Sequence, residues 1–289
     1  MDATTQMYVA QGIHGLAYGM VLFLVASGLT LIFGMMGILN IAHTAFFMLS
    51  AYFCYQIVSW TGNFWLALLL APLATAIIGV LVERLLLRRV HALGLLELTL
   101  TIGVMFVIME AVKLFWGTEN LPLAVPQLLG GLVNIGGMEY PLYRLFIIGL
   151  SLVVLGFLAF ILYKTRLGMV VRAAVSDADM VNALGINVPL LFMFVFGIGT
   201  WLAGVAGVAI APILTVFPGL ADQMGMDAFI VVIVGGFGSL GGALLVAIIS
   251  GLLSSYGVQF VSQLAPVLMF IFMAVVLAIK PTGFFGERE

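Results

Sequence analysis

Residues 12–34 read GIHGLAYGMVLFLVASGLTLIFG, a stretch without Asp, Glu, Lys or Arg. A helix needs about 20 apolar residues to cross the hydrocarbon core of a bilayer, because each residue rises about 1.5 Å. This stretch therefore predicts a membrane-spanning helix. The whole chain of 289 residues has the same character, with 64% hydrophobic and 8% charged residues and a mean hydropathy of +1.29. Soluble domains carry about 25% charged residues, so the composition excludes a soluble globular class.

Further apolar stretches meet the same standard along the chain. They are residues 40–60, 63–83, 95–116, 142–163, 188–214 and 239–257, followed by the shorter 264–280. Residues 227–237 are apolar but too short to cross alone, and they run into a glycine cluster, which predicts a broken or re-entrant segment near 227–242. Membrane strands would alternate over about ten residues, which these unbroken runs do not. We expect an all-α integral membrane protein, a single domain over residues 1–289 with eight spans, or nine if 227–237 crosses.

The basic residues orient the spans. Six of the ten Lys and Arg residues fall in two loops, as Arg84, Arg88 and Arg89, and as Lys164, Arg166 and Arg172. Loops rich in Lys and Arg face the cytoplasm. The two loops are separated by two spans, so both can lie on that side, which leaves the N-terminus and loop 117–141 outside. The C-terminus lies outside after eight spans and inside after nine, and we favour inside.

The longest polar stretch on the cytoplasmic side is residues 164–187, KTRLGMVVRAAVSDADMVNALGIN. Ser176 is a suitable N-cap, Asp177 and Asp179 place negative charge in the first turn, and Gly185 suits the left-handed position after a helix. These signals predict a helix over roughly 177–184, about 12 Å long.

This short helix needs a surface against which to pack, because a helix of two turns is not stable alone. Its apolar side chains are Met180, Val181 and Leu184. In one interpretation the segment is a connector lying on the protein's own membrane face. In the other it is a docking helix that fits a groove in a cytoplasmic partner.

Three motifs carry a resemblance to a known family. Residues 28–52, GLTLIFGMMGILNIAHTAFFMLSAY, resemble the opening motif of branched-chain amino acid permeases of ATP-binding-cassette importers. The loop from Gly168 through Arg172 to Asn187 resembles that family's cytoplasmic coupling loop, and residues 232–253 match its third signature. The chain most resembles the shorter of the family's two permease subunits. Thr44 departs from the pattern, because a glycine commonly follows the histidine there.

The resemblance implies a transport subunit of the bacterial cytoplasmic membrane that passes branched-chain or similar small amino acids by alternating access. It also implies a second permease subunit, two cytoplasmic ATPase subunits and an extracytoplasmic substrate-binding protein. The residues expected to couple to the ATPases are Arg172, Ser176, Asp177, Asp179, Met180, Val181, Leu184 and Gly185. Relatives that import urea, short amides or aromatic acids leave the cargo open, and a stand-alone channel or secondary transporter remains the rival class.

The sequence offers no catalytic or cofactor chemistry of its own. The run GGFGSLGG lacks the lysine and following Ser or Thr of a P-loop, so ATP and Mg²⁺ are expected in partner subunits. His14, His43 and His91 are too far apart for metal-ligand spacing, and the lone Cys54 excludes an internal disulfide. We expect neither enzymatic activity nor a metal, nor nucleic-acid binding.

Polar groups at membrane depth are the candidates for a translocation path. The expected path residues lie where the first span meets the second: Gly34, Gly37, Asn40, His43 and Thr44. Broken helices with free backbone groups commonly line such paths. The alternative is that Asn40 merely caps the second helix and that a neighbouring backbone group satisfies His43.

The remaining features predict local pairing and packing. Glu110 and Lys113 are three residues apart and predict a salt bridge at the outer interface, while Glu97 is expected to be solvated or paired with an arginine of 84–89. Small residues spaced for close helix packing, within the subunit or against a second permease, are Gly15, Gly19, Gly235, Gly236, Gly238 and Gly242.

Overall fold

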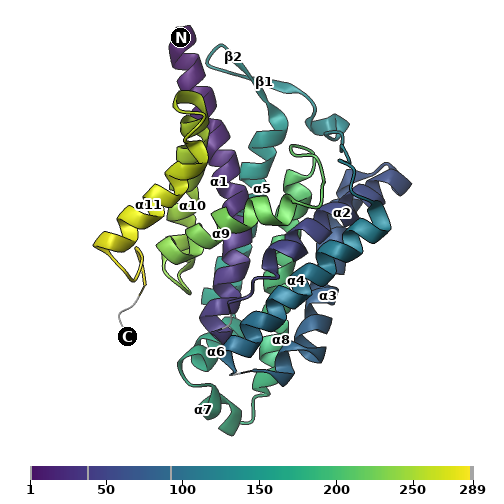
Figure 1. Ribbon diagram of the computed structural model, residues 1–289, viewed down its shortest axis with the longest axis vertical. Coiled ribbons are helices and arrows are strands. Elements are labelled where there is room, and N and C mark those ends of the chain that lie inside the picture. Colours follow the sequence, from purple (N-terminus) through teal and green to yellow (C-terminus); the bar gives the residue numbers. More distant parts are fainter. Residues whose placement is uncertain (1, 38, 92, 287–289) are drawn as a thin grey trace.

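The computed structural model describes residues 2–37, 39–91 and 93–286 and shows a bundle of helices (Figure 1). Six helices in these ranges are long and apolar enough to cross a membrane. They are α1 (Ala3–Met36), α3 (Phe64–Leu85), α4 (Gly94–Trp116), α5 (Leu142–Lys164), α8 (Val188–Ile210) and α10 (Leu240–Phe260). The candidate membrane spans are therefore all helices, and the chain is a multi-pass membrane protein.

Shorter helices complete the bundle. They are α2 (His43–Thr61), α6 (Arg166–Ser176), α7 (Ala178–Ala183), α9 (Leu220–Gly235) and α11 (Ala265–Ile279), with 3₁₀ turns at Leu87–Arg89 and Gln127–Leu129. The expected count of eight or nine spans is not confirmed by helix length, because α2, α9 and α11 fall short of the criteria that the six long helices meet.

The break near residues 227–242 lies where the glycines predicted it. Helix α9 ends at Gly235, and Gly236 has a φ of 95°, a left-handed conformation that a side chain disfavours. Helix α9 begins at Leu220, however, seven residues before the apolar run. Because Asp222 and Gln223 are polar, hydropathy did not predict the first turns of this helix.

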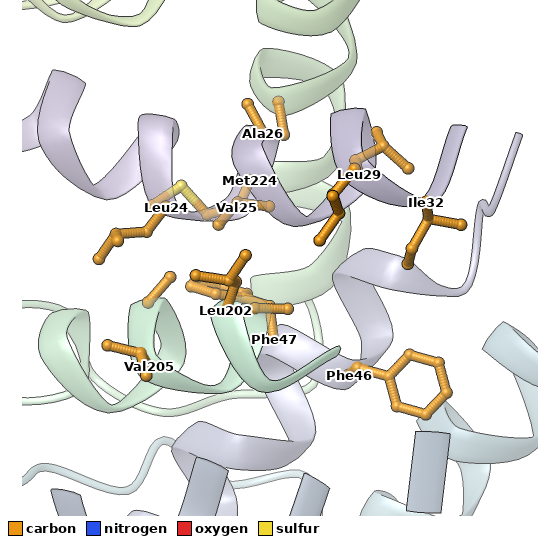
Figure 2. Close-up of a cluster of buried hydrophobic side chains, with 14 of the residues drawn as sticks. Leu24, Val25, Ala26, Leu29, Ile32, Phe46, Phe47, Leu202, Val205 and Met224 are labelled. Atoms are coloured by element: carbon orange, nitrogen blue, oxygen red, sulfur yellow. The ribbon is translucent and has the colours of Figure 1, made fainter. Parts of the chain in front are cut away.

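Helix α1 lies at the centre of the bundle, with α10 along one side and α8 along another. Figure 2 shows the core where α1, α2, α8 and α9 meet. Its labelled side chains are Leu24, Val25, Ala26, Leu29, Ile32, Phe46, Phe47, Leu202, Val205 and Met224. Helices α3, α4 and α5 instead expose large apolar side chains, such as Ile77, Val107 and Phe160. Such exposed apolar faces suit a lipid surrounding.

Loop 117–141 contains a β-hairpin that the sequence analysis missed. Strand β1 (Leu132–Ile135) pairs antiparallel with β2 (Met138–Pro141). The side-chain oxygen of Asn134 accepts a hydrogen bond from the Gly137 N–H at 2.8 Å and closes the turn. The Asn-Ile-Gly-Gly sequence was the available signal, because Asn and Gly favour hairpin turns.

The two ends of the bundle differ in character. The N-terminus and the β-hairpin lie at one end, where Gln6 contacts the Gly137 carbonyl, and α6 and α7 lie at the other (Figure 1). Arg84 and Arg88 line a shared hollow with Asn187, so both basic loops occupy the α7 end. This is the arrangement that the number of intervening spans predicted.

Candidate functional site

Helix α2 begins inside the bundle. Residues 43–52 are all buried, and the Nε2 atom of His43 lies 3.1 Å from the carbonyl oxygen of Val25, about three turns before α1 ends at Met36. Gly28, which the sequence analysis did not single out as a functional residue, makes room for this ring. A Cβ on Gly28 would lie 2.8 Å from the His43 Cε1 atom. The first residues of α2 therefore lie in the interior, beside the middle of α1.

Polar atoms in this interior junction lack partners. Among the described residues, neither the amide oxygen nor the amide nitrogen of Asn40 has a hydrogen bond, and neither does the Nδ1 atom of His43. The α2 N-cap is Ala42, which has no side-chain cap, so Asn40 does not cap this helix. Burying an unpaired polar group costs free energy, which makes this junction suited to a polar solute or water.

The other expected path residues have different surroundings. Thr44 packs against α9, where a Cβ on Gly225 would lie 3.4 Å from its side chain. A Cβ on Gly34 would lie 2.9 Å from the Gly238 Cα, so Gly34 makes close backbone contact with the break between α9 and α10. Space beside Gly37 is open. The structure thus groups Asn40, His43 and Thr44 in the interior and leaves the two glycines at its margin.

The small residues of α1 lie against α10. A Cβ on Gly15 would lie 2.8 Å from the Leu252 Cα, and a Cβ on Gly19 would lie 2.5 Å from the Ala247 carbonyl oxygen. Gly251 contributes from the α10 side, because a Cβ there would lie 2.5 Å from the Gly19 nitrogen. These glycines pack helices within the subunit.

The glycines at the break between α9 and α10 also allow close backbone contact. A Cβ on Gly235 would lie 2.7 Å from the Gly242 carbonyl carbon. Gly236 faces the C-terminal segment, in which the Phe284 N–H donates to the Val234 carbonyl at 2.8 Å. The C-terminal segment therefore satisfies a carbonyl that the end of α9 leaves free.

The loop 164–187 forms two helices instead of one. Helix α6 (Arg166–Ser176) was not expected, although Thr165 was a signal, since its hydroxyl accepts from the Gly168 N–H at 3.2 Å. The prediction that Ser176 is the N-cap of the next helix is wrong, because Ser176 still belongs to α6. Asp177 has extended backbone angles, and its carboxylate accepts from the Met180 N–H at 2.8 Å. Asp177 is thus the N-cap of α7.

Beyond α7, Gly185 has the left-handed conformation that its position predicted, with a φ of 85°. Met180 and Leu184 are 59% and 74% exposed, whereas Val181 is buried in the protein's own core. Asp179 is exposed on the same helix. The short helix therefore packs on the bundle through Val181, while Met180 and the C-cap residue Leu184 are exposed.

Arg172 ties α6 to α5. Its guanidinium donates to the Leu162 carbonyl and lies 5.7 Å from the centre of the Tyr163 ring. These contacts give Arg172 a structural role in seating the loop on the bundle.

The predictions for the Glu110–Lys113 pair and for Glu97 have different outcomes. Glu110 and Lys113 form the expected pair, with Nζ 2.7 Å from Oε1, at an exposed position. Glu97 is buried rather than solvated, and one of its carboxylate oxygens lies 3.2 Å from the Nδ1 atom of His91. The turn between α3 and α4 brings His91 back over the start of α4, which spacing alone did not reveal.

Comparisons with known proteins agree with this architecture. The chain matches the family described as branched-chain amino acid transport system / permease component over residues 13–279. It is 30% identical to the high-affinity branched-chain amino acid transport system permease protein BraD of Pseudomonas aeruginosa, covering 98% of this chain and 97% of BraD. It is 29% identical to the Escherichia coli permease protein LivH, covering 98% and 96%.

Among solved structures, PsaBC from Streptococcus pneumoniae in complex with Fab superposes with a TM-score of 0.52 at 11% identity. The likeness covers 94% of this chain and 91% of that chain. At this identity it speaks for the fold alone.

Proposed function

The chain belongs to the family of branched-chain amino acid transport system permease components, and from that premise we propose that it is the permease subunit of an ATP-binding-cassette importer. In this proposal it passes branched-chain or similar small amino acids across the bacterial cytoplasmic membrane by alternating access. The complete importer in this proposal also contains a second permease subunit, two cytoplasmic ATPase subunits that bind ATP and Mg²⁺, and an extracytoplasmic binding protein. The chain itself needs no cofactor and is not an enzyme.

The observation that carries the proposal is the exposed apolar face of α7. Met180 of α7 and Leu184, the C-cap residue that follows it, are exposed at the end of the bundle that carries the basic loops, and the Asp177 cap and the buried Val181 fix the helix. Exposed apolar side chains on a firmly seated helix are suited to the groove of a partner protein. A stand-alone channel has no ATPase partner to bind and therefore does not require such an exposed apolar face.

The proposed membrane topology follows from the placement of the basic loops on the cytoplasmic side. With the basic loops inside, α1 begins outside and ends inside, and the proposal assigns nine crossings that include α2, α9 and α11. The C-terminus then lies inside. Two contacts support this assignment: Gly238 packs on Gly34 near the end of α1, and the Phe285 N–H donates to the Gly235 carbonyl at 3.2 Å. They hold the C-terminal segment at the end of α1 opposite to the N-terminus.

The translocation path in this proposal passes the junction of α1 and α2. Asn40 and His43 offer unpaired polar atoms there, and Thr44 borders α9, whose far end is the glycine break. A rigid movement transmitted from α7 through α8 would change the packing of this junction. Gly34 and Gly37 would act as pivots rather than as ligands.

The test is a paired substitution, Met180→Glu with Leu184→Glu, in the importer reconstituted with its ATPases and binding protein. We expect loss of leucine uptake and of ATPase association, because charges cannot enter an apolar groove without desolvation. The control is Met169→Glu, an equally exposed apolar position on α6. Uptake and association that survive the paired substitution would refute docking through α7.

Urea, short amides or aromatic acids are the alternative cargo. Because specificity in such importers is expected to reside in the soluble receptor, binding of these compounds to the cognate binding protein discriminates among them.

A further inference from the structure

A hollow of about 190 Å³ lies at the end of the bundle that carries α7, between the end of α3 and the start of α8 (Figure 1). Two guanidinium groups and an amide share its lining with apolar side chains: Arg84, Arg88, Asn187, Pro189, Leu190 and Met193. The hollow is therefore separate from the docking face of α7 and from the translocation path that are proposed for the chain.

Antiparallel packing of α3 on α8 brings these side chains together. A Cβ on Gly204 would lie 2.8 Å from the Pro72 Cα, and a Cβ on Gly197 would lie 2.8 Å from the Val80 Cγ2 atom. Positions of increasing number on α3 thus lie opposite positions of decreasing number on α8. About two turns further along, the same register places the arginines at the end of α3 beside the first residues of α8. Residues far apart in the sequence thereby share one hollow.

The hollow carries a net positive charge. Among the described residues, no carboxylate lies within ion-pair distance of Arg84 or Arg88. The buried Glu83 carboxylate attracts Arg88 from beyond that distance, and its Oε2 atom has no hydrogen-bond partner. Two arginines against one such carboxylate leave an excess of positive charge, to which the peptide dipoles at the start of α8 add.

An apolar face continues from the arginines towards the middle of the bundle. Ile77 and Leu81 of α3 and Leu190 and Phe194 of α8 are exposed. Residues three or four apart share one face of a helix, so Leu81 and Arg84 lie on the same side of α3. On α8, Leu190 lines the hollow, and Phe194 follows it about one turn further in. Positive charge and exposed apolar surface thus adjoin where α3 ends and α8 begins.

The polar atoms of the hollow suit a phosphate group. A guanidinium fork matches the oxygens of phosphate, and basic pockets between membrane helices on the cytoplasmic side bind anionic lipid headgroups. Asn187 adds donors, because its Oδ1 atom accepts from the Leu190 N–H at 3.0 Å while its amino group keeps two N–H donors. A free anion would use these donors but not the adjoining apolar face. A phospholipid uses both.

We propose that the hollow binds one anionic phospholipid of the cytoplasmic leaflet, with its phosphate on Arg84 and Arg88 and an acyl chain along the exposed apolar face of α3 and α8. A zwitterionic phospholipid is disfavoured, because its headgroup cation meets the excess positive charge. Asn187 is the N-cap of α8 and follows shortly after α7, so the bound lipid links α3 to the segment that carries α7. The leaflet is the one that the proposed orientation of the basic loops makes cytoplasmic.

The experiment titrates the full chain, purified in detergent, with three probes and counts the bound molecules by native mass spectrometry. The probes are dioctanoyl phosphatidylglycerol, dioctanoyl phosphatidylcholine, and glycerophosphoglycerol, which is the headgroup of the first without its acyl chains. Phosphatidylglycerol should bind about tenfold more tightly than phosphatidylcholine, since charge-assisted hydrogen bonds contribute most where no headgroup cation opposes them. Glycerophosphoglycerol should bind more weakly than phosphatidylglycerol, because it has no acyl chain to bury.

Substitution of both arginines, Arg84→Gln with Arg88→Gln, should abolish the preference for phosphatidylglycerol. The matched control is Arg89→Gln with Arg166→Gln, which removes the same charge from exposed arginines at the same end of the bundle that do not line the hollow. The preference should persist in the control. Loss of the preference in both pairs would overturn the proposal, because it would reflect a general effect of surface charge. So would equal binding of the two lipids by the unaltered chain.

A third variant tests the contact with the acyl chain. Leu190→Gln keeps both arginines and should weaken both lipids about threefold while leaving glycerophosphoglycerol unchanged, because it makes part of the apolar lining polar. Glycerophosphoglycerol that binds as tightly as phosphatidylglycerol would overturn the proposal, since the hollow would then hold a free anion.

An acidic side chain of an ATPase subunit is the other candidate for the hollow, and the reconstituted importer distinguishes it from a lipid. If Arg84→Gln with Arg88→Gln abolishes association with the ATPases while the preference for phosphatidylglycerol remains, the arginines bind a partner protein and the lipid proposal is overturned. Association that persists while the preference is lost supports the lipid.

Discussion

The Nε2 atom of His43, the first residue of α2, lies 3.1 Å from the carbonyl oxygen of Val25 within α1. This hydrogen bond holds the start of α2 inside the bundle. His43→Ala should lower stability by about 1–3 kcal/mol, because it removes a buried hydrogen bond and leaves a cavity where the ring packed. His43→Gln retains an N–H donor and should lose less. Thermal unfolding of the purified importer, followed by size-exclusion fluorescence, measures both, and equal losses would contradict the role of the hydrogen bond.

Close packing of α1 on α10 predicts that Gly19→Ala is destabilising. The added Cβ would lie 2.5 Å from the Ala247 carbonyl oxygen, which forces the helices apart and costs about 1–3 kcal/mol. Gly103→Ala on α4 is the control, since a Cβ there meets open space. The melting temperature should fall for Gly19→Ala only. Indistinguishable melting temperatures for the two variants would contradict the close packing of α1 on α10.

The cap of α7 predicts a coupling defect. Asp177→Ala removes the acceptor for the Met180 N–H and should destabilise the helix by about 1 kcal/mol, whereas Asp177→Ser retains an acceptor. Weaker association of the ATPases is expected for alanine only, measured as the concentration that gives half-maximal ATPase stimulation. A Ser176→Ala control should be silent, because Ser176 lies in α6.

The interior junction predicts state-dependent access. In a Cys54→Ser background, Asn40→Cys should react with a small thiol reagent faster during ATP turnover than at rest. Ala26→Cys in the apolar core should stay unreactive throughout, since it lies among the side chains of Figure 2. Mass spectrometry of the labelled chain gives both rates. Identical rates at Asn40→Cys in both conditions would remove the junction from the path.

The orientation predicts opposite labelling of two exposed positions. In the same Cys54→Ser background, Glu119→Cys lies in the loop beside the N-terminal end, and Asn182→Cys lies on α7. An impermeant maleimide added to intact spheroplasts should label the first and not the second. Reversed labelling would invert the topology.

Much of the fold could be predicted because hydropathy is decisive in a bilayer. Backbone groups in lipid must be satisfied internally, so long apolar runs form helices regardless of their neighbours. Local chemistry likewise predicted the break at Gly236, the left-handed Gly185 and the pair of Glu110 with Lys113. These features depend on residues only a few positions apart, which is the range over which a sequence specifies geometry.

Contacts between distant residues were decided by the tertiary structure. The sequence could not place the start of α2 against Val25, choose His91 for Glu97, or reveal which helix each glycine touches. The contacts of Arg144 with His14 and of Asp227 with Tyr18 join α5 and α9 to α1, and no local pattern encodes them. Spans and their order follow from the free energy of transferring side chains into lipid, a property of each segment alone. The polar sites depend on how those segments pack, and only the folded bundle fixes that.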